Sequence, residues 1–306
     1  MKKGSWYLNM LILFTSVIFL ILSIFVYSFI IQKYPKVTEY QLTSSKIPST
    51  FNGYKILQIS DLHNTLFGEN QIRIISKIKE INPNIIVFTG DLIDYRRFHN
   101  EIKIENNKII TNKKDIPIIN LLEQLKDYPV YMVYGNHERI YNLDDDSQLL
   151  LELIDETGAK FINNESFKIY IGNDYINLLG VADPSTINMD YFRDNEKLII
   201  KLDEITTNIK ENEYTILLSH RPELLENVYS KYNIDLVLTG HAHGGQIRLP
   251  FIGGLYAPHQ GKYPTYDKGL FEFKNTKMIT SAGLGNTSFP LRVFNRPELV
   301  LITLTD

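Results

Sequence analysis

The sequence predicts a layered α/β fold with mixed sheets, preceded by one membrane-spanning helix. Three observations predict it. Short apolar runs alternate with helical patterns in the first half of the chain, whereas the last third contains mostly strand patterns. Five apolar runs each end in metal-binding side chains, as strands do at the sites of open α/β sheets. The N-terminal region also contains a long stretch without charge.

The composition narrows the class of protein. With 306 residues, the chain is long enough for one large domain or two ordinary ones. A net charge of −3 gives no indication of a nucleic-acid partner, because binding to a phosphate backbone needs a concentrated basic face. Cysteine is absent, which excludes disulfides and thiolate metal sites.

Residues 1–31 are expected to form a short tail and a transmembrane anchor. Residues 8–31 carry no charged side chain, and about 20 apolar residues suffice to cross a bilayer core. Trp6 and Tyr34 lie near the ends of this stretch, where interfacial aromatic side chains gather. A signal peptide is the main alternative, but its apolar region is only about 7–15 residues and precedes a small-residue cleavage site, which this stretch lacks. A buried globular helix is the other alternative.

The orientation of this anchor depends on the flanking charges. Lys2 and Lys3 precede the span, and Lys33 and Lys36 follow it, so the charge bias nearly cancels. The short positive start is typical of signal anchors. We therefore expect a single-pass protein of the cell membrane, with the body of the chain outside the cytoplasm.

The remaining elements follow in order along the chain. Residues 32–51 form a polar connector with a strand near Val37–Leu42, and the body of the chain spans residues 52–306. Residues 99–114, rich in Asn, Lys and Glu, predict a surface excursion. Apolar residues at i, i+3 and i+4 predict helices, which are expected at Gln71–Ile81, Ile116–Lys126 and Gln148–Thr157.

Strand patterns dominate after residue 160. Phe167–Ile171 and Tyr175–Leu179 flank Gly172-Asn173-Asp174, which predicts a hairpin. Further strands are expected at Leu270–Phe273, Met278–Thr280 and Leu299–Leu304.

The run ends supply the candidate site. Each apolar run is followed at once by carboxylate, amide or imidazole side chains. Oxygen and imidazole ligands gathered at one sheet edge suit a pair of divalent metals. The clusters are Asp61-Leu62-His63 after 55–60, Gly90-Asp91 after 84–89, Gly135-Asn136-His137-Glu138 after 130–134, His220 after 214–219, and Gly240-His241-Ala242-His243 after 235–239.

Each cluster taken alone also has an ordinary structural interpretation. An Asp after a strand is often a turn former or helix cap, and a buried, hydrogen-bonded His is the usual reading of His220. Spacing strengthens the metal interpretation, since residues two apart in an extended chain face the same side. The spacing holds for Asp61 with His63 and for His241 with His243. His137 titrates near neutrality and suits proton transfer.

The ordered set D-x-H, GD, GNHE, H and GHxH resembles the calcineurin-like metallophosphoesterase superfamily, over about Asn52 to Thr303. The stretches GHAHGGQIRLP at 240–250 and SAGLGNTSFPLRVFNRP at 281–297 look like its branch of membrane-associated bacterial phosphodiesterases. The resemblance implies a four-layer α-β-β-α sandwich with mixed sheets.

The resemblance also implies roles for the residues that match its motifs. Asp91 would bridge two ions, a hydroxide shared by the ions would attack phosphorus, and His137 would donate a proton to the leaving oxygen. The implied ligands are Asp61, His63, Asp91 and His243 for one ion, and Asp91, Asn136, His220 and His241 for the other.

Ligand type does not select the metal, because Mn, Fe, Zn, Co and Ni all accept nitrogen and oxygen donors; we favour Mn. Arg221 and Arg248 are candidates for contact with a substrate phosphate, although an ordinary salt-bridged arginine is an equal alternative.

The expected function is a membrane-anchored, dinuclear-metal phosphohydrolase. It would cleave a phosphodiester or pyrophosphate, in a small molecule or in a lipid or cell-envelope component. The alternatives are a non-catalytic anchored binding module on the same fold and a nuclease or nucleotide phosphodiesterase. No nucleic-acid partner is expected, because the chain lacks an aromatic-basic stripe.

Overall fold

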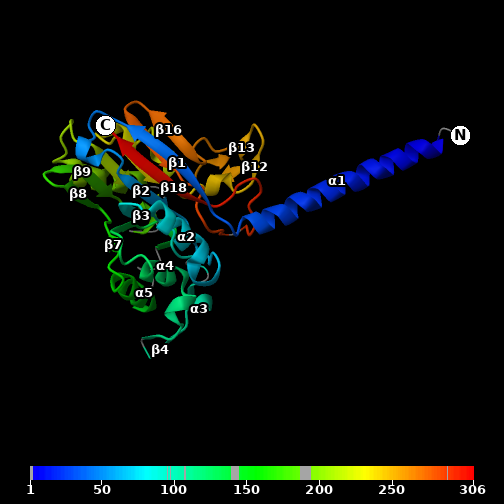
Figure 1. Ribbon diagram of the computed structural model, residues 1–306, viewed down its shortest axis with the longest axis horizontal. Helices are drawn as coiled ribbons and strands as arrows, with labels where there is room; N and C mark the ends of the chain where they lie inside the picture. Colours follow the sequence, from blue (N-terminus) through cyan, green and yellow to red (C-terminus); the bar gives the residue numbers. More distant parts are fainter. Residues whose placement is uncertain are drawn as a thin grey trace.

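Two six-stranded sheets pack face to face and form the centre of the molecule (Figure 1). The first sheet has the order β1 (Lys36–Thr43), β18 (Glu298–Thr305), β2 (Lys55–Ile59), β3 (Ile85–Thr89), β6 (Val130–Val133) and β7 (Lys160–Phe161). The second has the order β16 (Gly269–Phe273), β17 (Thr276–Thr280), β11 (Leu236–Thr239), β10 (Thr215–Leu218), β9 (Asp174–Gly180) and β8 (Glu165–Ile171). The computed structural model describes residues 3–94, 96, 98–106, 108–138, 145–186, 194–287 and 289–306.

Both sheets are mixed. In the first, β18 pairs antiparallel with β2, while β2, β3, β6 and β7 run parallel. In the second, β9, β10, β11 and β17 run parallel, and β8 and β16 pair antiparallel at the two edges. The parallel strands therefore place their carboxyl ends along a common edge of each sheet, which is where the polar clusters follow.

Helices cover the outer faces of the two sheets. On β2, Ile56 packs between the sheets, whereas its neighbour Leu57 packs against the helices, as the two-residue period of a strand requires. The outer face of the first sheet is covered by α2 (Ile72–Ile81), α4 (Pro117–Glu123) and α5 (Asp145–Asp155). The outer face of the second is covered by α6 (Asp194–Thr206). The predicted four-layer α-β-β-α sandwich is confirmed.

The predicted elements lie close to their expected bounds, and the structure contains further elements that the sequence did not predict. The helix expected at Gln148–Thr157 is α5, which begins at Asp145 and ends at Asp155. Helix α6 was not expected from the sequence. The excursion at 99–114 contains α3 (Phe98–Glu101) and a ribbon of β4 (Ile104–Glu105) and β5 (Lys108–Ile109).

The predicted connector contributes to the sheet. Strand β1 pairs in parallel with β18 along its whole length, and Phe51 is buried between the sheets. Residues 36–51 therefore share the core of the body.

Helix α1 (Lys3–Ile31) extends away from the body of the molecule (Figure 1). Its stretch Trp6–Ile31 is long and apolar enough to cross a membrane, and none of its most apolar window is buried inside the structure. Near the base of α1 lie two small ribbons, β12 (Arg248–Leu249) with β13 (Gly253–Gly254) and β14 (Tyr256–Ala257) with β15 (Gly261–Lys262).

Candidate metal centre

All five polar clusters lie at the carboxyl ends of parallel strands. Asp61 and His63 follow β2, Asp91 follows β3, and Asn136 follows β6 in the first sheet. In the second sheet, His220 follows β10, and His241 and His243 follow β11. The facing sheets bring these loops together, and every one of these His and Asp side chains is buried.

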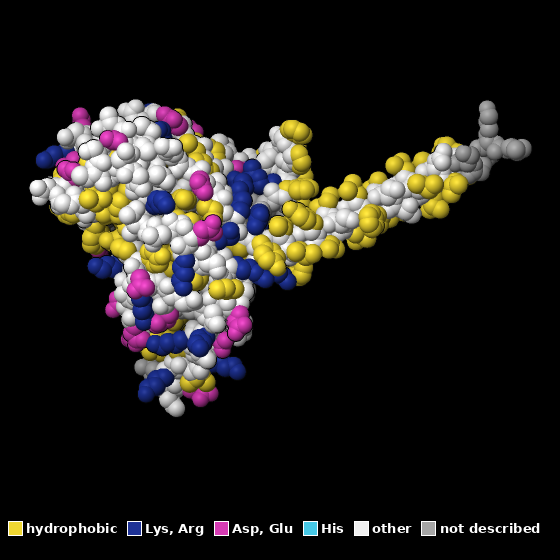
Figure 2. Space-filling view, viewed as in Figure 1, with side chains coloured by type: hydrophobic (Ala, Val, Ile, Leu, Met, Phe, Trp, Pro, Cys, Tyr) yellow, Lys and Arg dark blue, Asp and Glu magenta, His cyan; other side chains and the backbone are white. Residues whose placement is uncertain are grey.

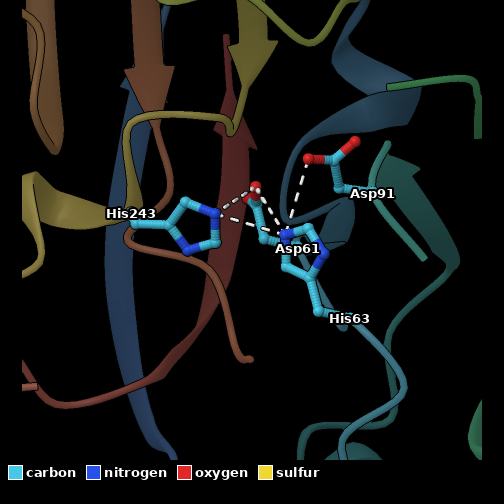
Figure 3. Close-up of side chains that lie close together, drawn as sticks. All are labelled: Asp61, His63, Asp91 and His243. Carbon is cyan, nitrogen blue, oxygen red and sulfur yellow. Dashed lines mark hydrogen bonds and ion pairs between the residues drawn. The ribbon is translucent and has the colours of Figure 1, made fainter. Parts of the chain in front are cut away.

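The first group of side chains is a compact cluster of four (Figure 3). Nε2 of His63 lies 3.2 Å from Nε2 of His243 and 3.5 Å from Oδ2 of Asp91. Oδ1 of Asp61 lies 3.4 Å from Nε2 of His243. Two imidazole nitrogens and two carboxylates thus converge on one buried point, as the ligands of a divalent cation do.

A second group shares Asp91 with the first. Nε2 of His220 lies 3.2 Å from Oδ2 of Asp91 and 3.2 Å from Oδ1 of Asn136. Nδ1 of His241 lies 3.1 Å from Nε2 of His220. Asp91 therefore stands between the two groups.

The backbone around these side chains is strained. Asp61, His63, Asp91, His241 and His243 all have φ between +45° and +66°, a region that residues other than glycine adopt at a cost. Such strain persists where the surrounding structure enforces it, and it gathers at functional sites.

Two glycines permit a close approach of the loops after β3 and β6. A Cβ atom on Gly135 would lie 2.3 Å from Oδ1 of Asp91, and one on Gly90 would lie 2.5 Å from the backbone of Gly135. Any larger residue would push the two loops apart. The glycines of the GD and GNHE motifs are therefore required by packing.

Glu138 joins the same two loops. Its buried carboxylate accepts hydrogen bonds from the backbone N–H groups of Asp91 at 2.9 Å, Gly135 at 2.7 Å and Leu92 at 2.7 Å. It therefore holds the turn that carries Asp91.

The electrostatics favour neutral rings at His63, His241 and His243 and positive charge beside Asp91. Burial lowers the pKa of His63, His241 and His243, which keeps these rings in the neutral form that binds metal. Burial alone would also lower the pKa of His220, but the carboxylate of Asp91 raises it to about 10. Asp91 thus draws positive charge into the pocket, and the nitrogen and oxygen donors fit divalent cations.

His137 lies beside this cluster and outside the two groups. Its backbone N–H donates to Oδ1 of Asp91 at 2.8 Å, and its Nδ1 lies 3.3 Å from Oδ1 of Asp94. Burial lowers the pKa of His137, but the carboxylates of Asp91 and Asp94 reverse this shift and raise it above the usual value. A ring held protonated next to the cluster is suited to donate a proton.

Three residues near the site carried no role in the sequence analysis. Asp94 orients His137. The indication of this in the sequence was the position of Asp94 three residues after Asp91. Nδ1 of His259 lies 2.8 Å from Nε2 of His241, and buried Arg292 reaches Nδ1 of His243 at 3.3 Å. His259 and Arg292 lie on loops whose folding no local pattern predicts. Nothing is described of the His99 side chain.

The two candidate phosphate-binding arginines are engaged elsewhere. Arg221 is buried and forms a two-point ion pair with Asp183, at 2.7 and 2.8 Å. Arg248 donates to Asp267 at 2.6 Å and to the carbonyl of Gly244 at 2.9 Å. Both therefore stabilise loops around the site.

The fold and this centre define a metal-dependent phosphoesterase. The chain belongs to the calcineurin-like phosphoesterase family, whose model matches residues 54–245. It is 31% identical over 269 residues to an uncharacterized metallophosphoesterase of Bacillus subtilis, YkuE, covering 87% of this chain and 84% of that protein. The predicted family and enzyme class are confirmed.

Other similarities are more distant. A transmembrane protein with a metallophosphoesterase domain from Danio rerio is 26% identical, over 88% of this chain and 57% of that protein. Among solved structures, a dimetal phosphatase from Danio rerio superposes with a TM-score of 0.47 at 13% identity, covering 78% of this chain and 91% of that one.

Proposed function

We propose that the chain is a membrane-anchored, dinuclear-metal phosphohydrolase that cleaves a phosphodiester or pyrophosphate in a lipid or cell-envelope component. Its body would lie outside the cytoplasm. The observation that carries the proposal is the short connection between the metal centre and the end of α1, which runs through Arg292 to Gln32.

The two groups of buried side chains provide a ligand set for each ion. Ions bound there would activate a water molecule and neutralise charge on the phosphoryl oxygens. Asp91 would serve both ions, since its carboxylate offers two oxygens. The sets are Asp61, His63, Asp91 and His243, and Asp91, Asn136, His220 and His241.

His137 would protonate the leaving oxygen. Asp94 holds its Nδ1 side, which leaves Nε2 to face the cluster, 4.0 Å from Oδ2 of Asp91. The carboxylates around the ring favour its protonated form, so it can act as a general acid near neutral pH.

One buried residue connects the metal centre with α1. Arg292 is 1% exposed; its guanidinium reaches His243, and its backbone N–H donates to Oε1 of Gln32 at 3.3 Å. Gln32 directly follows α1, which ends at Ile31. A membrane crossed by α1 would therefore lie close to the metal centre, which suits a substrate held at the bilayer surface. The transmembrane relative from Danio rerio, by its name, supports attachment to a membrane.

Hydrolysis assays with the full-length chain test this proposal. The purified chain in proteoliposomes would be given Mn²⁺ and bis-p-nitrophenyl phosphate, then polyprenyl pyrophosphate, a glycerophospholipid and soluble nucleotides. We expect metal-dependent turnover, with a higher kcat/KM for a lipid-linked substrate than for a nucleotide. Asp91→Ala is the matched inactive control.

Two results would contradict parts of the proposal. A metal-loaded chain without turnover on any substrate would indicate a binding module. A clear preference for nucleotides would retain the phosphohydrolase and remove the lipid assignment. A reporter fused to the C-terminus tests the orientation, and reporter activity in the cytoplasm would contradict an external body.

A further inference from the structure

The turn between β12 and β13 exposes apolar side chains at its tip. Phe251 is 109% exposed and Ile252 is 58% exposed, although both are among the most apolar side chains. Phe251 also has a φ of +66°, which bulky residues adopt only when the surrounding structure enforces it. The turn thus holds an aromatic ring outward in water, where it gains nothing from burial.

An ion pair and backbone hydrogen bonds hold the base of this turn in place. Arg248 donates to Asp267 at 2.6 Å, and the same carboxylate oxygen accepts from the backbone N–H of Gly254 at 2.8 Å. The backbone N–H of Arg248 donates to the carbonyl of Val293 at 2.9 Å. The tip therefore extends from a base whose position is fixed by these contacts.

The same contacts connect the turn with α1. Val293 follows Arg292, whose backbone N–H donates to Gln32 at 3.3 Å, and Asn286 donates to the same Gln32 oxygen at 3.1 Å. The chain segment that receives the end of α1 thus also supports the turn. The position of the apolar tip relative to the helix end is set by a short, continuous series of hydrogen bonds.

The surface between the two features has the character of a membrane interface. Exposed Phe289 and Phe294 lie on the segment that joins them. An apolar groove of about 400 Å³ separates α1 from Pro290 and Leu291, with Phe25, Val26 and Phe29 lining its helix side. Figure 2 shows apolar surface at the base of α1 and on the neighbouring loop, with a patch of Lys and Arg side chains beside them.

Basic residues surround the exit of the helix. Lys33 lies over the Phe29 ring at 4.6 Å, and the Arg73 guanidinium lies over the Tyr34 ring at 4.2 Å. Arg296 donates to the Tyr34 carbonyl. Basic side chains next to a span attract anionic lipid headgroups, while apolar and aromatic side chains enter the interface. The basic side chains and the apolar side chains together therefore fit an anionic bilayer surface.

We propose that the β12–β13 turn is a second membrane contact, which inserts Phe251 and Ile252 into the headgroup region of an anionic bilayer beside α1. The inference rests on the proposed anchoring by α1. Two contacts restrict tilting of the body relative to the bilayer, and so hold the loop after His243 toward the bilayer surface.

Tryptophan fluorescence in proteoliposomes tests the second contact. The full-length chain contains a single tryptophan, Trp6. In a Trp6→Phe background, Phe251→Trp or Ile252→Trp places the only reporter at the tip, and Tyr170→Trp places it on β8, at a site that is 59% exposed. Vesicles of phosphatidylcholine and phosphatidylglycerol would carry brominated acyl chains, and metal content would verify that each variant is folded.

We expect quenching at position 251 or 252 to be several-fold stronger than at 170, and strongest with bromines near the headgroup. Equal quenching at 251, 252 and 170 would overturn the second contact. The native chain, with its reporter at Trp6, tests the anchor separately. Strong quenching of Trp6 with none at the tip would retain the anchor and reject the turn, whereas an unquenched Trp6 would reject the anchor itself.

Discussion

Two regions of the molecule reverse the usual distribution of side chains. At the carboxyl ends of the sheets, carboxylates and imidazoles are buried; in α1, large apolar side chains are exposed. Buried charge is unfavourable unless it is paired, and exposed apolar surface is unfavourable in water. Under the proposed function, a different external component would complete each region, a cation in one case and a hydrocarbon layer in the other.

The two regions also differ in how their residues are arranged. The buried centre is assembled from loops far apart in sequence and depends on distances of a few ångströms. Helix α1 is a single local segment whose composition matters more than any particular contact. Substitutions in the centre should therefore act by removing or moving single atoms. Substitutions in α1 should act by changing the total hydrophobicity of the helix.

The largest expected effect is that of Asp91→Ala. Asp91 is the one carboxylate that both ligand groups share among the described residues, so its loss would weaken both sites and expose facing imidazoles to each other. We expect activity to fall below detection and bound metal to fall with it. Asp155→Ala, at an exposed carboxylate of α5, is the control and should change neither. Retention of both ions in Asp91→Ala would contradict the shared role.

The next effect concerns α1. Replacing Ile18 and Ile21 with lysine places two charges near the middle of the span, at about 2.5–3.5 kcal/mol each for insertion. We expect the full-length chain to move from the carbonate-washed membrane fraction to the soluble or aggregated fraction, while the double leucine variant stays in the membrane. An unchanged distribution would exclude α1 as the anchor.

His137→Ala separates proton transfer from metal binding. Removing a general acid lowers the rate by about 10²- to 10⁴-fold, and His137 lies outside both ligand groups, so metal content should stay unchanged. The loss in kcat should be greater for an alkyl phosphodiester than for a p-nitrophenyl ester, because p-nitrophenolate leaves without a proton. Equal losses for the two leaving groups would argue against the acid role.

The smallest of these effects is expected from Glu138→Gln. The substitution keeps the size of the side chain but places an amide NH₂ against backbone N–H donors. Leaving such donors unsatisfied costs about 1–3 kcal/mol. Chemical denaturation should show this loss in the free energy of unfolding, with Glu156→Gln, at an exposed site, as the control. An unchanged stability would mean that Glu138 does not hold the Asp91 turn.

The sequence predicted the buried centre better than its surroundings. Strands β2, β3, β6, β10 and β11 are short apolar runs, and parallel strands bring their carboxyl ends together by geometry alone. His259 and Arg292 were not predicted, because both reach the centre from irregular loops. The strand near Val37–Leu42 was predicted, but its place in the first sheet was not, since pairing of β1 with β18 joins segments far apart in the sequence and leaves no local signal.

Metal stoichiometry tests the central claim most directly. The full-length chain, purified in detergent and dialysed against trace Mn²⁺, Fe²⁺ and Zn²⁺, would be measured by mass spectrometry of the elements, beside His241→Ala. Our account predicts about two ions per chain, as in two-metal hydrolases, and about one in the variant. A chain that holds no ion, or a native chain that binds only one, would contradict it.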